Sequence, residues 1–257
     1  MLRREPHRRP AHPGPIVPPA SKVFESKTVH TGTIGGMADG FHPPLEEYLE
    51  AIHELEEEGA HVIQARLAER VGHSAPAVSE MIRRLKTEGY LTVEDRDVQL
   101  TAKGRLRAES VVRRHRLAER LLTDIIGLPW EKAHVEACRW EHVISDDVEA
   151  RLIALLGNPQ TCPHGNPIPG SGPRVGPDVV VLSSVPGGER VRLERVTEQV
   201  EIDPAALAYL SHHGFLPGTD ACVTDRAPDG TLTLEFDEHT IALGPALTQQ
   251  LYVSAGR

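Results

Sequence analysis

The sequence has little that would suit secretion or a membrane. Only 3 of its 257 residues are cysteines, too few for a disulfide framework, so the reducing cytoplasm is the expected compartment. No run approaches about 18 consecutive apolar residues, which excludes a transmembrane helix. The basic N-terminus lacks the apolar stretch of a secretory signal. Hydrophobic residues still make up 39% of the chain, enough for the cores of one to three domains.

The charge of the chain is unevenly distributed. A formal net charge of -9 argues against a protein that coats nucleic acid nonspecifically. The segment from Ala60 to Arg107, however, contains nine lysines and arginines and only six aspartates and glutamates, so it carries a local positive excess. This segment is therefore the first candidate for contact with DNA.

The N-terminal segment shows no helical or strand period. Six of its first twenty residues are prolines and four are arginines, so residues 1–40 are predicted to be a disordered extension. Met37 stands at the end of this segment, which suggests the hypothesis that translation starts there.

After residue 40 the pattern changes to helices and a hairpin. Apolar residues at helical spacing predict an amphipathic first helix that ends at Gly59: Leu45, Tyr48, Leu49, Ile52 and Leu55. A shorter helix ends at Gly72, and a third ends at Gly89. Alternating residues from Tyr90 to Thr101 predict a β-hairpin. Three helices followed by a hairpin are typical of a winged helix-turn-helix.

The third helix is the expected recognition helix, with Ser74 as its N-cap and Pro76 in its first turn. The N-terminal residues of such a helix enter the major groove, while nearby cations neutralise phosphates. The residues expected to face bases are Ser74, Ala77, Ser79 and Glu80. Those expected to contact the DNA backbone are Arg83, Arg84, Lys86, Arg96 and Lys103. A winged helix that contacts only protein is the alternative, and the local positive charge favours DNA.

Two longer helices, Ala102–Ile126 and Trp130–Leu156, are predicted to follow, and they carry residues of metal-ligand type. At 100° per residue, four of these share one face of the second helix: His134, Cys138, Glu141 and His142. His115 and Glu119 share a face of the first. Imidazole, thiolate and carboxylate together suit a divalent transition metal, because neither Mg²⁺ nor Ca²⁺ prefers sulfur.

Nothing in the sequence supports hydrolytic chemistry. There is no HExxH motif and no nucleophile with an evident base.

The two long helices predicted over Ala102–Ile126 and Trp130–Leu156 are too apolar to be isolated on a surface. They are therefore predicted to pack on each other and on a second subunit.

The last third of the chain is predicted to be a linker and a small β-rich domain. Residues 158–188 are rich in proline and glycine, as a linker would be. Beyond them, Arg190–Val196 and Thr231–Phe236 alternate as strands do, and Pro204–His213 is helical in pattern. Cys222 lies in an apparent strand without a ligand-type neighbour, so it is interpreted as structural.

Two further groups admit both a structural and a functional interpretation. Glu47, Glu50 and Glu54 follow one face of the first helix, and a solvated face is the ordinary explanation of such a charge run. Cys162 and His164 lie in a proline-rich turn, where they could bind metal or pack the turn.

Several longer motifs resemble a known family. They are the runs of residues 114–122 (RHRLAERLL), 126–130 (IGLPW), 136–143 (EACRWEHV) and 165–170 (GNPIPG). They closely resemble the diphtheria toxin repressor and iron-dependent regulator family, which includes manganese transport regulators. The resemblance extends from Glu46 to the C-terminus and weakens after Pro169.

The resemblance implies a mostly α fold with small β parts. The expected divisions are the extension (1–40), a winged helix-turn-helix DNA-binding domain (41–109), a metal-binding and dimerisation domain with its proline-rich linker (110–177) and an SH3-like β domain (178–257). It also implies a metal-activated transcriptional regulator, most simply a repressor of metal-uptake genes, and not an enzyme. Its expected partners are a second copy of itself and a palindromic operator bound by one or two dimers, with no membrane.

The resemblance also implies a primary regulatory metal site. Its ligands would be Glu47, Glu50, Cys138, Glu141 and His142. Carboxylates at positions 47 and 50 match the manganese-responsive branch, whereas Cys138 matches the iron-responsive branch. Oxygen ligands favour Mn²⁺ and sulfur favours Fe²⁺ or Co²⁺, so the sequence leaves Mn²⁺ and Fe²⁺ open, with Co²⁺, Ni²⁺ or Zn²⁺ as substitutes.

A second, ancillary site would start from His115, Glu119 and His134. In the iron branch, residues matching Glu198 and Glu201 of the SH3-like domain complete it. In some manganese-responsive relatives a linker Cys and His do so instead, and these match Cys162 and His164. Both ligand sets are present, and the sequence does not choose between them.

The recognition helix matches the family at Ser74, Pro76 and Ser79. Ala77 replaces a threonine, and Glu80 replaces a glutamine that approaches bases, so the operator is expected to differ.

The alternative to a metal-activated regulator is a winged-helix protein with a structural metal and constitutive DNA binding. A third hypothesis is a metallohydrolase. Such an enzyme needs a free base beside an open metal site, and the sequence offers none.

Overall fold

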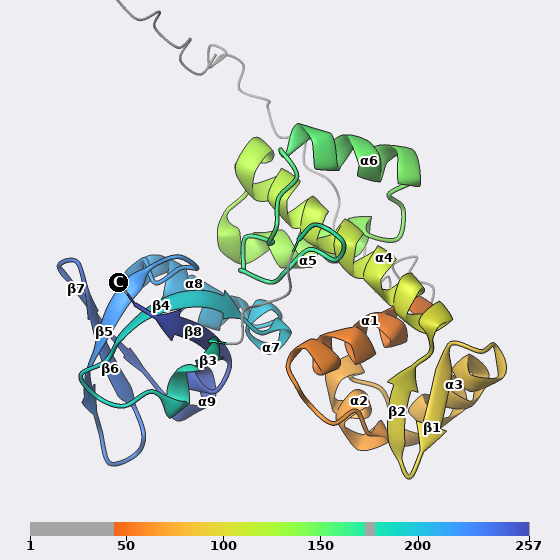
Figure 1. Ribbon diagram of the computed structural model, residues 1–257, viewed down its shortest axis with the longest axis horizontal. Coiled ribbons are helices and arrows are strands. Elements are labelled where there is room, and N and C mark those ends of the chain that lie inside the picture. Colours follow the sequence, from red (N-terminus) through yellow and green to blue (C-terminus); the bar gives the residue numbers. More distant parts are fainter. Residues whose placement is uncertain (1–43, 173–177, 257) are drawn as a thin grey trace, which may run out of the picture. The chain divides into compact units, whose positions relative to one another are not determined.

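The computed structural model describes residues 44–172 and 178–256, and the extension predicted for residues 1–40 lies outside this range. Helices dominate the first part of the described chain and strands the second (Figure 1). The predicted fold class, mostly α with small β parts, is confirmed. No helix among the described residues is long and apolar enough to span a bilayer.

The first region is the predicted winged helix-turn-helix. Its elements are α1 (Pro44–Glu57), α2 (Gln64–Val71), α3 (Ala75–Thr87), β1 (Leu91–Glu94) and β2 (Asp97–Leu100). Leu49 and Ile52 of α1 are buried in the same hydrophobic core as Val78 and Ile82 of α3. The two helices therefore share one core, which fixes α1 against α3, the expected recognition helix.

The hairpin is fixed to the helix that follows it. Its two turn residues, Asp95 and Arg96, both have positive φ, as a two-residue hairpin turn requires. At the start of α4, a Cβ on Gly104 would lie 2.1 Å from the carbonyl oxygen of Tyr90, so only glycine allows this close approach. The Thr101 side chain accepts a hydrogen bond from the Gly104 amide and caps α4.

The helical region departs from prediction in its second half. It comprises α4 (Ala102–Arg120), the π-helical stretch η1 (Leu121–Ile126), α5 (Trp130–Trp140) and α6 (Asp146–Leu155). The single helix predicted over Trp130–Leu156 is therefore wrong, because α5 ends at Trp140. Ser145 then caps α6 by accepting a hydrogen bond from the amide of Val148, which favours a new helix over continuation of the old one.

Two parts of the predicted linker, 158–188, are described: residues 178–188 contain β3 (Val180–Val181) and η2 (Leu182–Ser184), and residues 158–172 form a packed segment. Cys162, His164, Asn166 and Ile168 are all at most 3% exposed. Alternate residues are buried because the segment turns back on itself, with a bridge between Thr161 and Pro167. It therefore presents Cys162 and His164 to the interior.

The remaining chain forms a six-stranded antiparallel sheet in the order β3-β8-β4-β5-β6-β7. Its elements are β3 (Val180–Val181), η2 (Leu182–Ser184), β4 (Arg190–Val196), α7 (Glu198–Glu201), α8 (Pro204–His213), β5 (Asp220–Arg226), β6 (Leu232–Phe236), β7 (His239–Leu243), α9 (Pro245–Thr248) and β8 (Leu251–Ala255). The strand predicted over Arg190–Val196 and the helix predicted over Pro204–His213 are confirmed, and Cys222 lies in β5.

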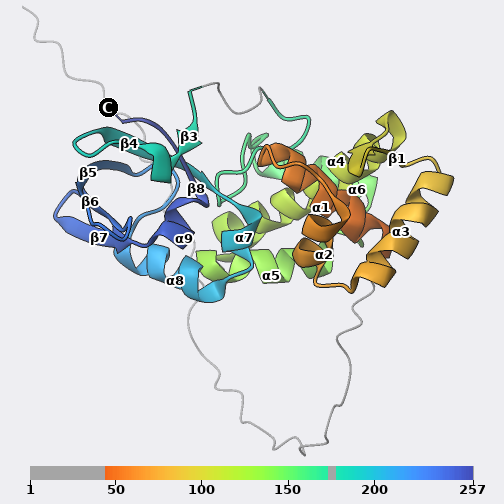
Figure 2. The ribbon, with the colours of Figure 1, turned by 90° about the horizontal axis from the view of Figure 1, so that it is seen from below.

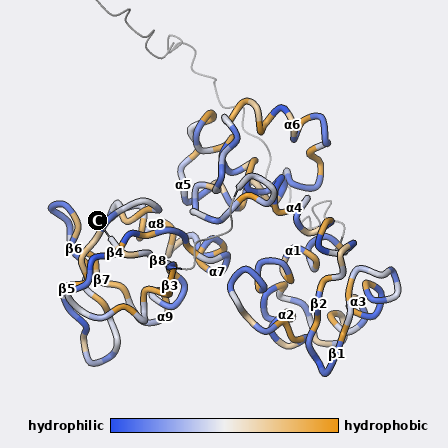
Figure 3. The backbone as a smooth tube through the Cα atoms, viewed as in Figure 1, coloured by the Kyte–Doolittle hydropathy of each residue, from blue (hydrophilic) through white to orange (hydrophobic). Residues whose placement is uncertain are grey.

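The helix α8 lies beside this sheet in both ribbon views (Figure 2). Apolar and hydrophilic stretches alternate along the described chain (Figure 3), and the buried apolar residues within it form three hydrophobic clusters. The sheet core includes Val200 and the adjoining α7 also carries Glu198 and Glu201, so packing of the sheet places these two carboxylates.

Candidate metal centre

A cavity of about 150 Å³ collects ligand-type side chains from α1, α4, α5 and α7. Its polar lining consists of Glu47, Glu50, Glu54, Arg70, His115, His134, Cys138, Glu141 and Glu198. The sequence interpretation of the α1 glutamates as a solvated face is wrong for Glu54, which is only 9% exposed. Glu54 shares the cavity because it follows Glu50 by one helical turn.

His142 lies at the edge of this group. Its Nε2 is 3.0 Å from Oε1 of Glu141, and its Nδ1 is 2.5 Å from Oε2 of Glu46. Glu46 also contacts Arg107 of α4. The expected primary ligands Glu47, Glu50, Cys138 and Glu141 thus line one cavity, and His142 adjoins them through Glu141. Sequence reasoning missed Glu46, because only the fold brings α1 to His142.

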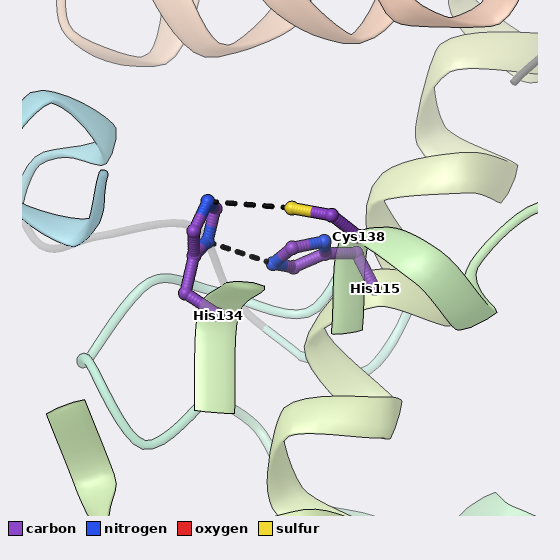
Figure 4. A group of neighbouring side chains, drawn as sticks. All are labelled: His115, His134 and Cys138. Carbon is purple, nitrogen blue, oxygen red and sulfur yellow. Dashed lines mark hydrogen bonds between the residues drawn. The ribbon is translucent and has the colours of Figure 1, made fainter. Parts of the chain in front are cut away.

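Two histidines adjoin both the cavity and the ancillary group, and Figure 4 shows them side by side with Cys138. His115 Nε2 lies 3.1 Å from His134 Nδ1, and Cys138 Sγ lies 3.4 Å from His134 Nε2. The other nitrogen of His115, Nδ1, is 2.5 Å from Oε2 of Glu141. Each ring therefore has one nitrogen toward the primary ligands and the other toward the ancillary ones.

The ancillary group contains both ligand sets that the sequence left open. Glu119 Oε1 is 3.3 Å from His115 Nε2, and 3.0 Å from Nδ1 of the linker residue His164. Glu201 Oε2 lies 3.4 Å from His134 Nδ1 and 3.0 Å from His164 Nδ1. Cys162 belongs to the same group. Glu198 is beside His134, with 3.0 Å between Oε1 and Nε2.

Burial and mutual attraction both shift the pKa values in this region. Burial alone lowers the pKa of His115, but the carboxylates of Glu119 and Glu141 outweigh it and raise that pKa well above its usual value. Burial raises the pKa of Cys138, and the neighbouring His115 and His134 reverse this to a net lowering. Burial, reinforced by Glu141, raises the pKa of Glu50 well above its usual value. The net directions favour the protonated form of His115 and the ionised form of Cys138 in the metal-free protein.

The residues fit a divalent transition metal. Both carboxylate oxygens of Glu119 and Nδ1 of His164 are buried, and the contacts that Glu119 Oε1 and His164 Nδ1 make are ion pairs with other ligand-type side chains of this group. Such atoms are costly to bury unless a ligand satisfies them. Ligand-type atoms from different elements lie within 4.8 Å of one another in each group, and nitrogen, sulfur and oxygen donors all occur among the groups. This donor set suits Mn²⁺, Fe²⁺, Co²⁺ or Zn²⁺.

The expected DNA-contacting side of α3 is exposed. Ser74, Pro76, Ala77, Ser79, Glu80, Arg83 and Arg84 all face solvent. Ser74 occupies the N-cap position without a side-chain capping bond, which leaves its hydroxyl available. Glu80 is paired with Arg83, and Arg84 with Glu88 at 2.8 Å. Lys103 donates to the carbonyl oxygen of Glu88 and lies over the Tyr90 ring, so it supports the wing.

Three family models match successive parts of the chain. They describe the iron dependent repressor N-terminal DNA binding domain (41–97), the iron dependent repressor metal binding and dimerisation domain (101–170) and a FeoA domain (180–255). The iron-dependent repressor IdeR of Mycobacterium tuberculosis is 46% identical over 205 residues, which cover 76% of this chain and 89% of that protein. The chain belongs to the iron-dependent repressor family. This family consists of metal-dependent transcriptional repressors, so the chain is a DNA-binding regulator and not an enzyme.

Further relatives include both iron- and manganese-dependent members. The diphtheria toxin repressor of Corynebacterium diphtheriae is 41% identical over 207 residues, covering 77% of this chain and 91% of that protein. A manganese-dependent transcriptional repressor in complex with manganese has a TM-score of 0.74 at 33% identity, covering 82% of this chain and 99% of that one. ScaR with bound Cd²⁺ has a TM-score of 0.71 at 30% identity, covering 83% and 100%.

Proposed function

We propose that this repressor is a homodimer that binds a palindromic operator of metal-uptake genes when it holds Mn²⁺ or Fe²⁺. The observation that carries the proposal is the cavity in which carboxylates of α1 meet a thiol and a carboxylate contributed by the α5 segment. Because α1 shares its core with α3, side chains that hold α1 against α5 also position the recognition helix. Its place of action would be the cytoplasm.

The proposed primary ligands are Glu47, Glu50, Cys138, Glu141 and His142, and an ancillary site would use the group around Glu119. A divalent ion there supplies positive charge among carboxylates that otherwise repel one another. Held by Glu50 and Glu141, whose ligand atoms lie within 4.8 Å of each other, the ion would offset the repulsion between their carboxylates. We expect α1 to be held in the position that sets the two recognition helices one helical turn of DNA apart, about 34 Å.

The proposed domain division is at residues 109/110 and 177/178; three family models follow one another in the same order, and the metal-binding model spans residues 101–170. A dimer is supported by exposed apolar side chains of the helical region. Ile125, Ile126, Val135, Val143 and Leu155 are each at least 44% exposed. A second subunit would remove this apolar surface from water, which is the usual driving force for association.

The test uses chelator-stripped protein and a pool of genomic DNA fragments. Fragments are retained on the protein without metal, with Mn²⁺, and with Fe²⁺ under anaerobic conditions. Selective retention only with metal is the expected result, and the ion active at the lower concentration is the better candidate for the sensed metal. Equal retention in all three arms would overturn the proposal and indicate a structural metal with constitutive DNA binding.

Two variants sharpen this test. Cys138→Ala removes a proposed primary ligand and should abolish metal-dependent retention. Cys222→Ala, in strand β5 outside the cavity, is the matched control and should retain DNA like the original chain. Metal and operator must also bind reciprocally, with a coupling of about 1–3 kcal/mol. A calorimetric metal affinity that is identical with and without operator would contradict the mechanism.

A further inference from the structure

The two ligand sets around the ancillary group share two carboxylates. One group of candidate ligands consists of His115, Glu119, His134 and Glu201, and the other of Glu119, Cys162, His164 and Glu201. All six side chains are at most 6% exposed. Glu119 and Glu201 occur in both groups, so the two sets meet at this pair of carboxylates.

Both shared carboxylates reach histidines of both groups. Glu119 Oε1 is 3.0 Å from His164 Nδ1 and 3.7 Å from His134 Nδ1. Glu201 Oε2 is 3.0 Å from His164 Nδ1 and 3.4 Å from His134 Nδ1. A carboxylate has two oxygens with lone pairs in several directions, so it can serve two cations at once. Enzymes with two-metal sites hold their ions about 3.5–4 Å apart.

The remaining contacts agree with two occupied positions. His115 Nε2 and His134 Nδ1 lie 3.1 Å apart, as two nitrogens directed at one ion would. The opposite nitrogen of His115 is held by Glu141 and that of His134 adjoins Glu198, which orients both rings. On the other side, His164 Nδ1 lies 3.0 Å from an oxygen of each shared carboxylate, and Cys162 belongs to the same buried group.

We propose that Glu119 and Glu201 bridge two divalent transition-metal ions, one completed by His115 and His134 and the other by Cys162 and His164. The ion-binding capacity is then three per protomer, because the primary cavity adds its own. This inference rests on the proposed function, which supplies the regulatory role of the ions. It adds that the ancillary centre holds two ions and that the two positions differ in their ligands.

The two positions differ in chemistry. The His115 position has only nitrogen and oxygen ligands, which Mn²⁺ and Fe²⁺ both accept. The Cys162 position adds a thiolate and favours Fe²⁺, Co²⁺ or Zn²⁺ over Mn²⁺. Co²⁺ should therefore fill both positions, while Mn²⁺ should fill the second only at higher concentration.

The first experiment counts Co²⁺ bound to the chelator-stripped full chain by elemental analysis after dialysis. We expect about three ions per protomer in the original chain and about two in the Cys162→Ser, His164→Gln double variant. Cys222→Ser is the matched control and should keep the original count. Circular dichroism on each sample verifies folding, and the single variant Cys162→Ser preserves side-chain volume if the double variant is unstable.

A second readout tests the sulfur ligand and the bridge. Near-ultraviolet thiolate-to-Co²⁺ absorption should fall by about half in Cys162→Ser, since Cys138 supplies the other thiolate, and should not change in Cys222→Ser. Magnetic coupling between two Mn²⁺ ions at high occupancy should disappear in the double variant. A count of two in the original chain, or an unchanged count in the double variant, would overturn the dinuclear centre. Metal-dependent DNA retention in those same samples would leave the proposed function intact.

Discussion

Nη2 of Arg195 donates a 3.2 Å hydrogen bond to the main-chain carbonyl oxygen of Glu57, the last residue of α1. Nη1 of the same guanidinium donates to Oδ1 of Asn166 at 3.1 Å. Asn166 in turn donates to Oε1 of Glu201 at 2.5 Å. Arg195 is 5% exposed, and its guanidinium lies 3.9 Å from the centre of the Tyr252 ring. A continuous hydrogen-bonded path thus joins a proposed ancillary ligand to the end of the helix that carries the primary ones.

Arg195→Met should weaken this path without disturbing the metal ligands. Methionine keeps the buried aliphatic length but removes both hydrogen bonds. We expect operator affinity at saturating metal to fall about 5-fold, which corresponds to about 1 kcal/mol, the scale of a lost hydrogen bond. Fluorescence anisotropy with labelled operator measures it. Arg192→Met, on the same strand, breaks an ion pair with Asp220 and is the control. Equal losses in both variants would show that the effect is not specific to Arg195.

Glu80→Gln should change which operators are selected. Glu80 is exposed on α3 and paired with Arg83, and a carboxylate can only accept hydrogen bonds. A glutamine amide can also donate, so it can pair with adenine in the major groove. Selection from a randomised duplex pool, with metal present, should return a different consensus. Glu88→Gln, at the end of the same helix, serves as the control. An identical consensus from Glu80→Gln and the original chain would refute a base contact.

Local sequence patterns predicted the winged helix well because its determinants are local. The apolar stripe of α1 and the alternation of β1 and β2 follow directly from helix and strand periods. The break between α5 and α6 escaped prediction, since the apolar pattern continues across it. Ser145 is a competent N-cap inside that pattern, and it decides the outcome through one side-chain bond.

The site was predictable to the extent that ligand types repeat at helical spacing. His115 with Glu119, and His134 with Cys138, stand one turn apart, so their common faces could be read from the chain. Arg195 could not be found in this way. Its partner Glu57 is 138 residues earlier, and no local pattern records a contact made by the fold. Glu54 did have a signal, its position one turn beyond Glu50, but a solvated face explains such a pattern equally well.

Metal binding should release protons, so the apparent metal affinity should fall as the pH is lowered. Burial lowers the pKa of His164, but Glu201 and Glu119 outweigh it and hold that pKa well above its usual value. Burial likewise lowers the pKa of His134 and Glu198 raises it, and the net result is a pKa well above the usual value. Both shifts favour the protonated rings in the metal-free protein, and an ion that binds there displaces those protons. Titration calorimetry in buffers of different ionisation enthalpy should reveal net release. A binding heat independent of the buffer would contradict protonated ligands.

His142 should make the stability of the metal-free protein depend on pH in the alkaline direction. Burial lowers its pKa, but hydrogen bonds to Glu141 and Glu46 outweigh burial and raise it from 6.5 to about 9. A raised folded-state pKa means that the protonated ring stabilises the fold fully below about pH 6.5, and that this contribution is lost as the pH rises through about 9.

Urea unfolding in chelator at pH 6 and at pH 9.5 measures this contribution. The original chain should lose more stability between the two values than His142→Gln, which cannot carry the proton. The exposed His212→Gln on α8 is the control and should behave like the original chain. The carboxylate partner makes the sign unambiguous, because Glu46 has its pKa lowered and stays charged across the whole interval. If His142→Gln lost as much stability as the original chain over this interval, the buried His142–Glu46 pair would not be the titrating element.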